Sequence, residues 1–161
     1  MAVKILEVKR ESCPAARLIG KRYEHGPNWG EWWQNDWFSV LEKNERLDIN
    51  GDAYIGAVHI VGGMPEYWIG MFFPVDTEVP EGFDFVDMEA LEYAVCYLYD
   101  KEGSGDFYTM ETHEECLEEL KSHGFKRKED DWCFERYNCP RFTTPDEEGN
   151  VILDYGISIE I

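Results

Sequence analysis

The sequence predicts an α+β fold made of two successive β-α-β-β units whose strands form one mainly antiparallel sheet. The order strand, helix, strand, strand occurs twice along the 161 residues, at an offset of roughly 80 residues. This length fits one domain, or two fused half-size units that share a core. Hydrophobic residues make up 43% of the chain, which is enough for such a core. We therefore expect a single domain with pseudo-repeats at 1–78 and 79–161.

The first unit is bounded by clear turn and capping signals. Asn28 and Glu31 have the capping-box spacing that starts a helix, directly after the break at Pro27. Glycine and proline over 62–65 indicate a hairpin turn, and Pro14 leaves open whether the first extended stretch is one strand or two. The predicted elements are extended stretches over 3–8 and 16–23, a helix from 28 to about 44, a turn at 50–52, and strands over 53–61 and 67–73.

The second unit follows a linker-like stretch over 75–82 and repeats the order. Thr112 and Glu115 again have capping-box spacing, which predicts that a helix begins at Thr112. Gly124 is predicted to follow the C-terminus of this helix, where glycine is the usual residue. The predicted elements are a long strand over 83–100, a turn over 103–105, a helix between 112 and 124, and strands over 132–138 and 150–161.

The charge is one-sided, since 34 acidic and 15 basic residues give a net charge of −19. Nucleic-acid binding depends largely on Lys and Arg, so this composition argues against a nucleic-acid partner and against an anionic membrane. The one dense basic run, 126–128, is followed at once by the acidic run 129–131. The simplest interpretation of the charge is solubility.

The cysteines and histidines show no metal-ligand spacing, so no metal and no cofactor is expected. An odd number of cysteines without a signal peptide predicts reduced, mostly buried thiols and a cytoplasmic protein. The apolar runs are too short to span a membrane. The five cysteines are Cys13, Cys96, Cys116, Cys133 and Cys139.

Aromatic residues are unusually frequent, at 15% of the chain. Four tryptophans, Trp29, Trp32, Trp33 and Trp37, lie within nine residues. Aromatic side chains bury large areas, but one short helix does not readily bury all four on one face. The surplus indicates a binding site for an aromatic or apolar small molecule.

Several short motifs, in order along nearly the whole chain, resemble the GyrI-like family, also known as AraC effector-binding domains. They are Pro14-Ala15-Ala16-Arg17-Leu18-Ile19-Gly20, His25-Gly26-Pro27, Tyr67-Trp68-Ile69-Gly70, Val79-Pro80-Glu81-Gly82-Phe83, Tyr93-Ala94-Val95 and Trp132-Cys133-Phe134-Glu135-Arg136-Tyr137.

The resemblance implies the duplicated SHS2 fold, with helices on one side of the sheet and a concave ligand cleft on the other. It implies binding of small, often lipophilic or cationic molecules. Without an N-terminal helix-turn-helix, the chain resembles the stand-alone members. One such subfamily hydrolyses cyclopropane-bearing DNA-alkylating compounds in an aromatic cage, and other members inhibit DNA gyrase.

Glu135 is the first candidate site residue. Alternation over 132–137 places Glu135 and Tyr137 on one face and Phe134 on the other, so if Phe134 packs toward the helices, Glu135 and Tyr137 face the cleft. The resemblance also places the family's cleft glutamate in this stretch. A carboxylate among aromatic rings attracts a cation, or accepts a proton when burial raises its pKa. The alternative is an exposed glutamate paired with Arg136 or Lys126.

The aromatic candidates each have a core alternative. Tyr67 and Trp68 point to opposite faces of one strand, and we select Trp68, with Phe72 on the same face, as the cleft residue. Trp29 and Trp33 are expected to rim the cleft, whereas Trp37 is expected in the core. Tyr93 and Tyr97 share a face that extends the cleft wall or belongs to the core.

Three functions remain open at this point. The first is a binding module that captures a lipophilic, aromatic or cationic xenobiotic and sequesters it or reports it to a protein partner. The second is a hydrolase in which Glu135, as the catalytic residue, activates water against a strained electrophile. The third is an acidic protein-interaction module, similar to the gyrase inhibitors.

Overall fold

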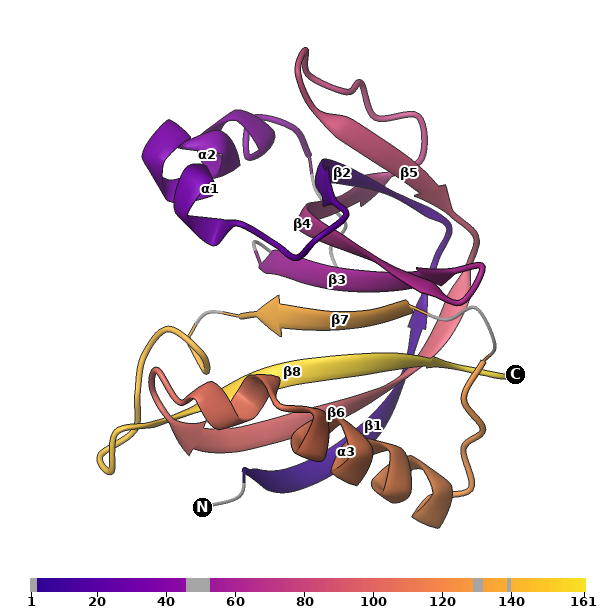
Figure 1. The fold of residues 1–161 in the computed structure, drawn as a ribbon, viewed down its shortest axis with the longest axis vertical. Coiled ribbons are helices and arrows are strands. Elements are labelled where there is room, and N and C mark those ends of the chain that lie inside the picture. Colours follow the sequence, from indigo (N-terminus) through magenta and orange to yellow (C-terminus); the bar gives the residue numbers. More distant parts are fainter. Residues whose placement is uncertain (1–2, 46–52, 129–131, 139) are drawn as a thin grey trace.

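The computed structural model describes residues 3–45, 53–128, 132–138 and 140–161. The predicted turn at 50–52, the acidic run 129–131 and the Cys139 thiol lie outside these ranges. Eight strands form a single open sheet in the order β1-β6-β8-β7-β3-β4-β2-β5, and every pair of neighbours is antiparallel. The predicted α+β class with a mainly antiparallel sheet is therefore confirmed (Figure 1).

The strand bounds follow the sequence patterns closely. Pro14 separates two strands that pair with different partners, and Gly62-Gly63 form the predicted hairpin turn with positive φ at both glycines. The strands are β1 Lys4–Cys13, β2 Ala16–Tyr23, β3 Tyr54–Val61, β4 Met64–Pro74, β5 Asp84–Met88, β6 Leu91–Lys101, β7 Trp132–Tyr137 and β8 Asn150–Ile159.

The sheet order is symmetric about its centre. If each strand is matched with the one four positions later, the order reads the same from either edge, with β3 and β7 as the central pair. The first strand of each half crosses over, since β1 pairs with β6 and β5 pairs with β2. A duplicated unit would produce this order, although the division at residue 78 itself stays a prediction.

The first predicted helix is two shorter helices, α1 (Trp29–Asn35) and α2 (Trp37–Leu41). Asn28 caps α1 as predicted, because its side chain accepts a hydrogen bond from the Glu31 N–H at 3.3 Å. The single helix to about Asn44 is wrong, because Asp36 adopts the left-handed conformation at φ 53° and ψ 42° and ends α1.

Two predictions in the second half also need correction. The helix α3 (Met110–Ser122) begins two residues earlier than predicted, since Thr109 is its N-cap and accepts from the Thr112 N–H. A short 3₁₀ helix, η2 (Gly105–Tyr108), precedes it. Gly124 does follow the C-terminus of α3, with φ +80°. The long strand over 83–100 is in fact β5 and β6, because residues 89–90 lead the chain from the edge strand β5 to β6, which lies next to the opposite edge of the sheet.

All the helices lie on one face of the sheet. Tyr54 and Tyr137 are direct partners across β3 and β7, so their side chains share a face. Tyr54 packs against the core cluster that contains Trp32 and Phe38 of α1 and α2, and Tyr137 packs against the cluster that contains α3. A third cluster fills the opposite face, and its members include Leu18, Trp68, Phe72, Tyr93, Val95 and Phe134.

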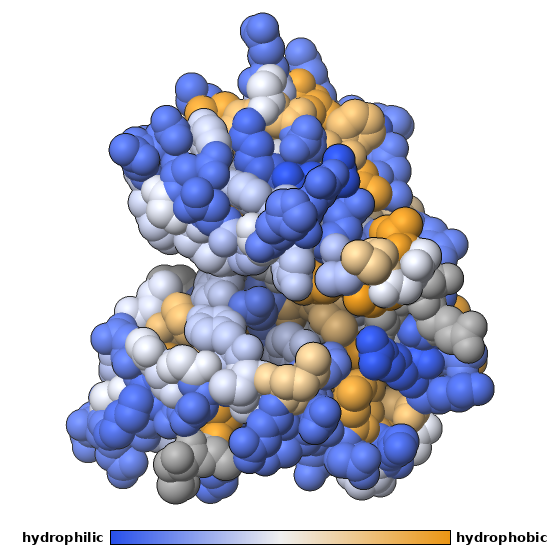
Figure 2. Space-filling view, viewed as in Figure 1, coloured by the Kyte–Doolittle hydropathy of each residue, from blue (hydrophilic) through white to orange (hydrophobic). Residues whose placement is uncertain are grey.

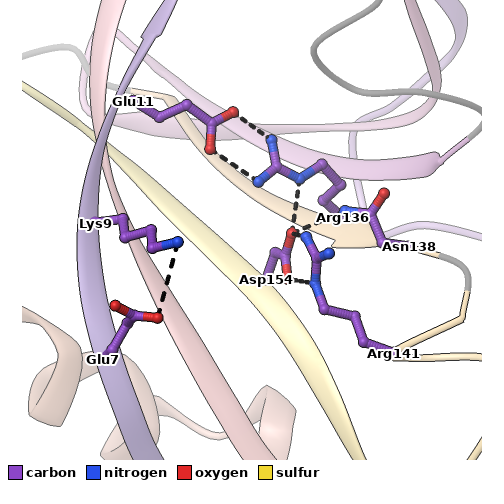
Figure 3. A network of polar contacts seen from close by, with 7 residues as sticks. All are labelled: Glu7, Lys9, Glu11, Arg136, Asn138, Arg141 and Asp154. Carbon is purple, nitrogen blue, oxygen red and sulfur yellow. Dashed lines mark hydrogen bonds and ion pairs between the residues drawn. The ribbon is translucent and has the colours of Figure 1, made fainter.

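A buried ion-pair network ties strands together on that opposite face (Figure 3). The Arg136 guanidinium donates to both carboxylate oxygens of Glu11 at 2.6 and 3.0 Å, and its Nε donates to Asp154 at 2.8 Å. Arg141 and Asn138 also donate to Asp154, which is fully buried. The network therefore joins β1, β7 and β8 directly beneath the position of Glu135.

No helix in the described part of the chain is both long enough and apolar enough to cross a membrane. Four cysteine thiols are free. Cys96, Cys116 and Cys133 are buried and Cys13 is half-buried.

Candidate functional site

A cavity of about 1560 Å³ opens on the helix face of the sheet, over the central strands β3 and β7. Figure 2 shows the hollow across the middle of the molecule, between the part that carries α1 and α2 and the part that carries α3. Its volume exceeds the roughly 300–1,000 Å³ of ordinary ligand pockets. The cavity lies between the helices on their own face, not on the opposite face where the ligand cleft was expected, because α1 and α3 leave the central strands uncovered.

The lining combines aromatic rings with a few ionisable groups. The lining includes Trp29, Trp33, Glu42, Tyr54, Gly56, Tyr67, Tyr108, His113, Glu114, Arg127, Glu135, Tyr137, Phe142 and Tyr155.

Glu135 is a half-buried carboxylate at the centre of the cavity floor. It lies on β7 directly opposite Gly56 of β3. The Tyr137 hydroxyl donates a hydrogen bond to its Oε2 at 2.7 Å. Burial raises the pKa of Glu135 from 4.5 to about 7, and the hydrogen bond from Tyr137 opposes that rise. Both the neutral acid and the carboxylate are therefore accessible near neutral pH.

Gly56 makes room for this carboxylate. A Cβ atom at position 56 would lie 3.0 Å from Cζ2 of Trp29 and 3.6 Å from Oε1 of Glu135. The absence of a side chain lets the indole edge and the carboxylate approach the same point on the floor. The indole edge thus adds apolar surface close to Glu135.

Aromatic rings surround the carboxylate in fixed edge-on and stacked contacts. The Trp29 and Tyr137 ring centroids are 5.3 Å apart at 82°, and Tyr137 meets Phe142 at 4.8 Å and 75°. Tyr54 is stacked on Phe38 at 3.7 Å and 3°. Such rings present faces of negative potential to a bound molecule.

A second polar pair lies across the floor from these rings. Tyr155 of β8 is the cross-strand neighbour of Glu135, and its hydroxyl is 2.6 Å from Nδ1 of His113 on α3. Burial raises the pKa of Tyr155, so its hydroxyl stays protonated. Among the described residues, no group of three His, Cys, Asp or Glu side chains is arranged to hold a metal ion.

The comparisons agree on the fold. No family model matches the chain, and no curated protein matches its sequence. Among solved structures, SAV2435 bound to tetraphenylphosphonium superposes with a TM-score of 0.69 at 16% identity, over 96% of this chain and 94% of that chain. A candidate bacterial transcription regulation protein from Staphylococcus aureus MU50 gives 0.67 at 16%, over 96% and 99%. The C-terminal domain of EcmrR gives 0.61 at 10%, over 99% of both chains. The chain has the GyrI-like fold.

Within this GyrI-like fold, four of the predicted site residues meet in one place. Glu135, Tyr137, Trp29 and Trp33 all line the cavity. Trp33 is 59% exposed and lies at the rim, where its ring centroid is 5.8 Å from that of Tyr54. Trp37, expected in the core, packs edge-on against the buried Trp32.

The remaining predicted residues lie on the opposite face of the GyrI-like sheet. Trp68 borders the cavity but is only 3% exposed, and it packs with Phe72 and Tyr93 in the core. Tyr97 packs against the edge of that cluster. The expected side of Phe134 was wrong: it packs away from the helices, so Glu135 and Tyr137 face the cavity on the helix side.

Several cavity residues were not among the predicted ones. Tyr67, rather than Trp68, shares a face with Glu135, as the β3–β4 and β3–β7 registers require. Tyr54 could have been found from the alternation of β3. No sequence signal indicated His113 or Tyr108, because α3 and η2, which contain them, reach the cavity only through the tertiary fold.

Proposed function

We propose that this protein binds lipophilic, aromatic cations in the cavity, with Glu135 as the counter-charge. The observation that carries the proposal is a carboxylate with a pKa of about 7 on the floor of an aromatic cavity. A carboxylate in low polarity is costly when it is alone, so a bound cation offsets that cost and favours the ionised form.

The surroundings of Glu135 favour the same class of ligand. The faces of the Tyr54 and Trp29 rings attract cations, and flat rings stack on them. The net charge of −19 raises the local concentration of cations near the surface. Lipophilic cationic xenobiotics combine these properties.

The fold comparison adds support of a different kind. SAV2435, which shares the fold at 16% identity, was solved with tetraphenylphosphonium, a lipophilic aromatic cation. We propose the same class of ligand for this chain.

A matched pair of ions tests the proposal. Tetraphenylphosphonium and tetraphenylborate have nearly the same size and shape but opposite charges. Titration calorimetry, with quenching of the fluorescence of Trp29 and Trp33, is expected to show binding of the phosphonium and at least tenfold weaker binding of the borate. Equal affinity for both ions would show that the site binds apolar molecules without regard to charge, which contradicts the role of Glu135 as the counter-charge. Binding of neither ion would refute the proposal.

Hydrolysis is a second candidate function, favoured by the raised pKa of Glu135 and its hydrogen bond from Tyr137. A carboxylate with this pKa can accept a proton from water as the water attacks a strained ring. Incubation with a neutral cyclopropane-bearing alkylating compound should then yield the ring-opened water adduct, and Glu135→Gln should stop turnover while binding is retained. If the product forms no faster with the protein than in buffer alone, hydrolysis is ruled out and binding is the remaining function.

A further inference from the structure

A second carboxylate is held at one end of the cavity. Glu42 follows the last residue of α2, and the Tyr54 hydroxyl donates a hydrogen bond to its Oε1 at 2.6 Å. Both residues line the cavity. The Tyr54 ring is stacked flat on Phe38, which directs the hydroxyl toward the exposed Glu42 carboxylate.

The two carboxylates are held in the same manner. Tyr54 and Tyr137 are direct cross-strand partners in the central β3–β7 pair, and each donates its hydroxyl to one carboxylate, Glu42 or Glu135. Tyr54 and Glu135 are diagonal neighbours across the two strands, about 7–8 Å apart, and the Tyr54 hydroxyl reaches on to Glu42. The carboxylates therefore lie on the order of 10 Å apart along the cavity.

The charge and size of the cavity exceed what one small cation uses. Of the Lys, Arg, Asp and Glu side chains that the structure describes in the lining, Glu42, Glu114 and Glu135 are acidic and Arg127 is basic. A single cation at Glu135 leaves the Glu42 end unoccupied within about 1560 Å³. The aromatic wall of Trp29, Trp33 and Tyr54 is continuous with both ends.

We propose that Glu42 and Tyr54 form a second cation subsite, so that the cavity binds elongated aromatic dications more tightly than monocations. The inference rests on the proposed function, because it places the first cationic centre at Glu135. The preferred ligands have two quaternary or aromatic cationic centres on the order of 10 Å apart, joined by an apolar body.

The test uses two probes that differ in one charge. The first has two quinolinium rings joined by an alkyl linker, and the second has the same linker with one quinolinium and one neutral naphthalene. Titration calorimetry at pH 8 compares the parent with Glu42→Gln, Glu135→Gln and Glu81→Gln. Glu81 is exposed and does not line the cavity, so its replacement controls for net charge.

Glu42→Gln is expected to weaken the dication about tenfold and to leave the monocation within about twofold, whereas Glu135→Gln weakens both. Tyr54→Phe keeps the ring stack but not the hydroxyl, and should weaken the dication alone by a smaller factor. Equal effects of Glu42→Gln on both probes, or none on either, would overturn the second subsite. If the monocation does not depend on Glu135, the proposed function itself fails, whatever Glu42→Gln does.

Discussion

Glu135→Gln is expected to unfold at a higher temperature than the parent protein at pH 8 and at nearly the same temperature at pH 4. Burial raises the pKa of Glu135 from 4.5 to about 7, so the folded state binds its proton more tightly than the unfolded state. The parent therefore loses stability as pH rises from about 4.5 to about 7, and no further above that. Glutamine does not titrate.

The size of the gain follows from the shift in pKa. The full shift would correspond to about 3 kcal/mol, and partial solvent access of the half-buried carboxylate reduces it to about 1–3 kcal/mol at pH 8. Thermal unfolding at pH 4, 6 and 8 measures it. A gap between the two proteins that is the same at pH 4 and pH 8 would contradict the raised pKa.

Glu135→Gln is expected to weaken ligand binding although it stabilises the fold. In the parent, the affinity for tetraphenylphosphonium should rise between pH 6 and pH 8, because the carboxylate forms in this range and the ligand has no titratable group. In Glu135→Gln the affinity should be about tenfold lower at pH 8 and independent of pH. The Glu81→Gln control should follow the parent. Position 135 would then trade stability for function.

Arg136→Ala is expected to cost about 3–5 kcal/mol of unfolding free energy, because it leaves the partly buried Glu11 without this cation and the buried Asp154 with Arg141 alone in place of two arginines. Arg136 is 3% exposed and forms a bidentate salt bridge with Glu11 in addition to its hydrogen bond with Asp154. Urea denaturation measures the loss. Arg136→Lys keeps the charge but not the planar fork, so an intermediate loss is expected.

An exposed ion pair supplies the control for this prediction. Arg10 donates to Glu92 at 2.9 Å, and its side chain is 47% exposed. Arg10→Gln should cost less than about 1 kcal/mol. Losses of similar size for Arg10→Gln and Arg136→Ala would show that burial does not set the strength of the Arg136 network.

Patterns of two-residue alternation allowed most of the strands and the face of Glu135 to be predicted. The alternation over 132–137 correctly separates Glu135 and Tyr137 from Phe134. It does not indicate which face the helices cover, because a central strand is buried on both sides and both faces contain large apolar residues. The side of Phe134 was therefore wrong, although Glu135 reached the cavity.

The tryptophans show a different limit. Trp29 and Trp33, four residues apart, line the cavity as the helical spacing predicts, and Trp32 is fully buried, but the spacing does not predict that the helix ends after Asn35. The left-handed residue Asp36 ends α1 and precedes α2, so Trp37 does not continue the stripe of Trp29 and Trp33. A single aspartate within a polar and aromatic segment carries no such signal before the fold is known.

The pairing of Gly56 with Glu135 has a consequence for how this cavity can diversify. The two positions face each other across the seam between the halves of the sheet, so large side chains on both would compete for one space. Carboxylates on both would also repel at about 5 Å. A functional side chain can therefore occupy one of the two positions only while the other position is a glycine. Exchanging the two residues, with glycine at position 135 and glutamate at position 56, would place the carboxylate on the other half of the sheet while keeping it over the same cavity.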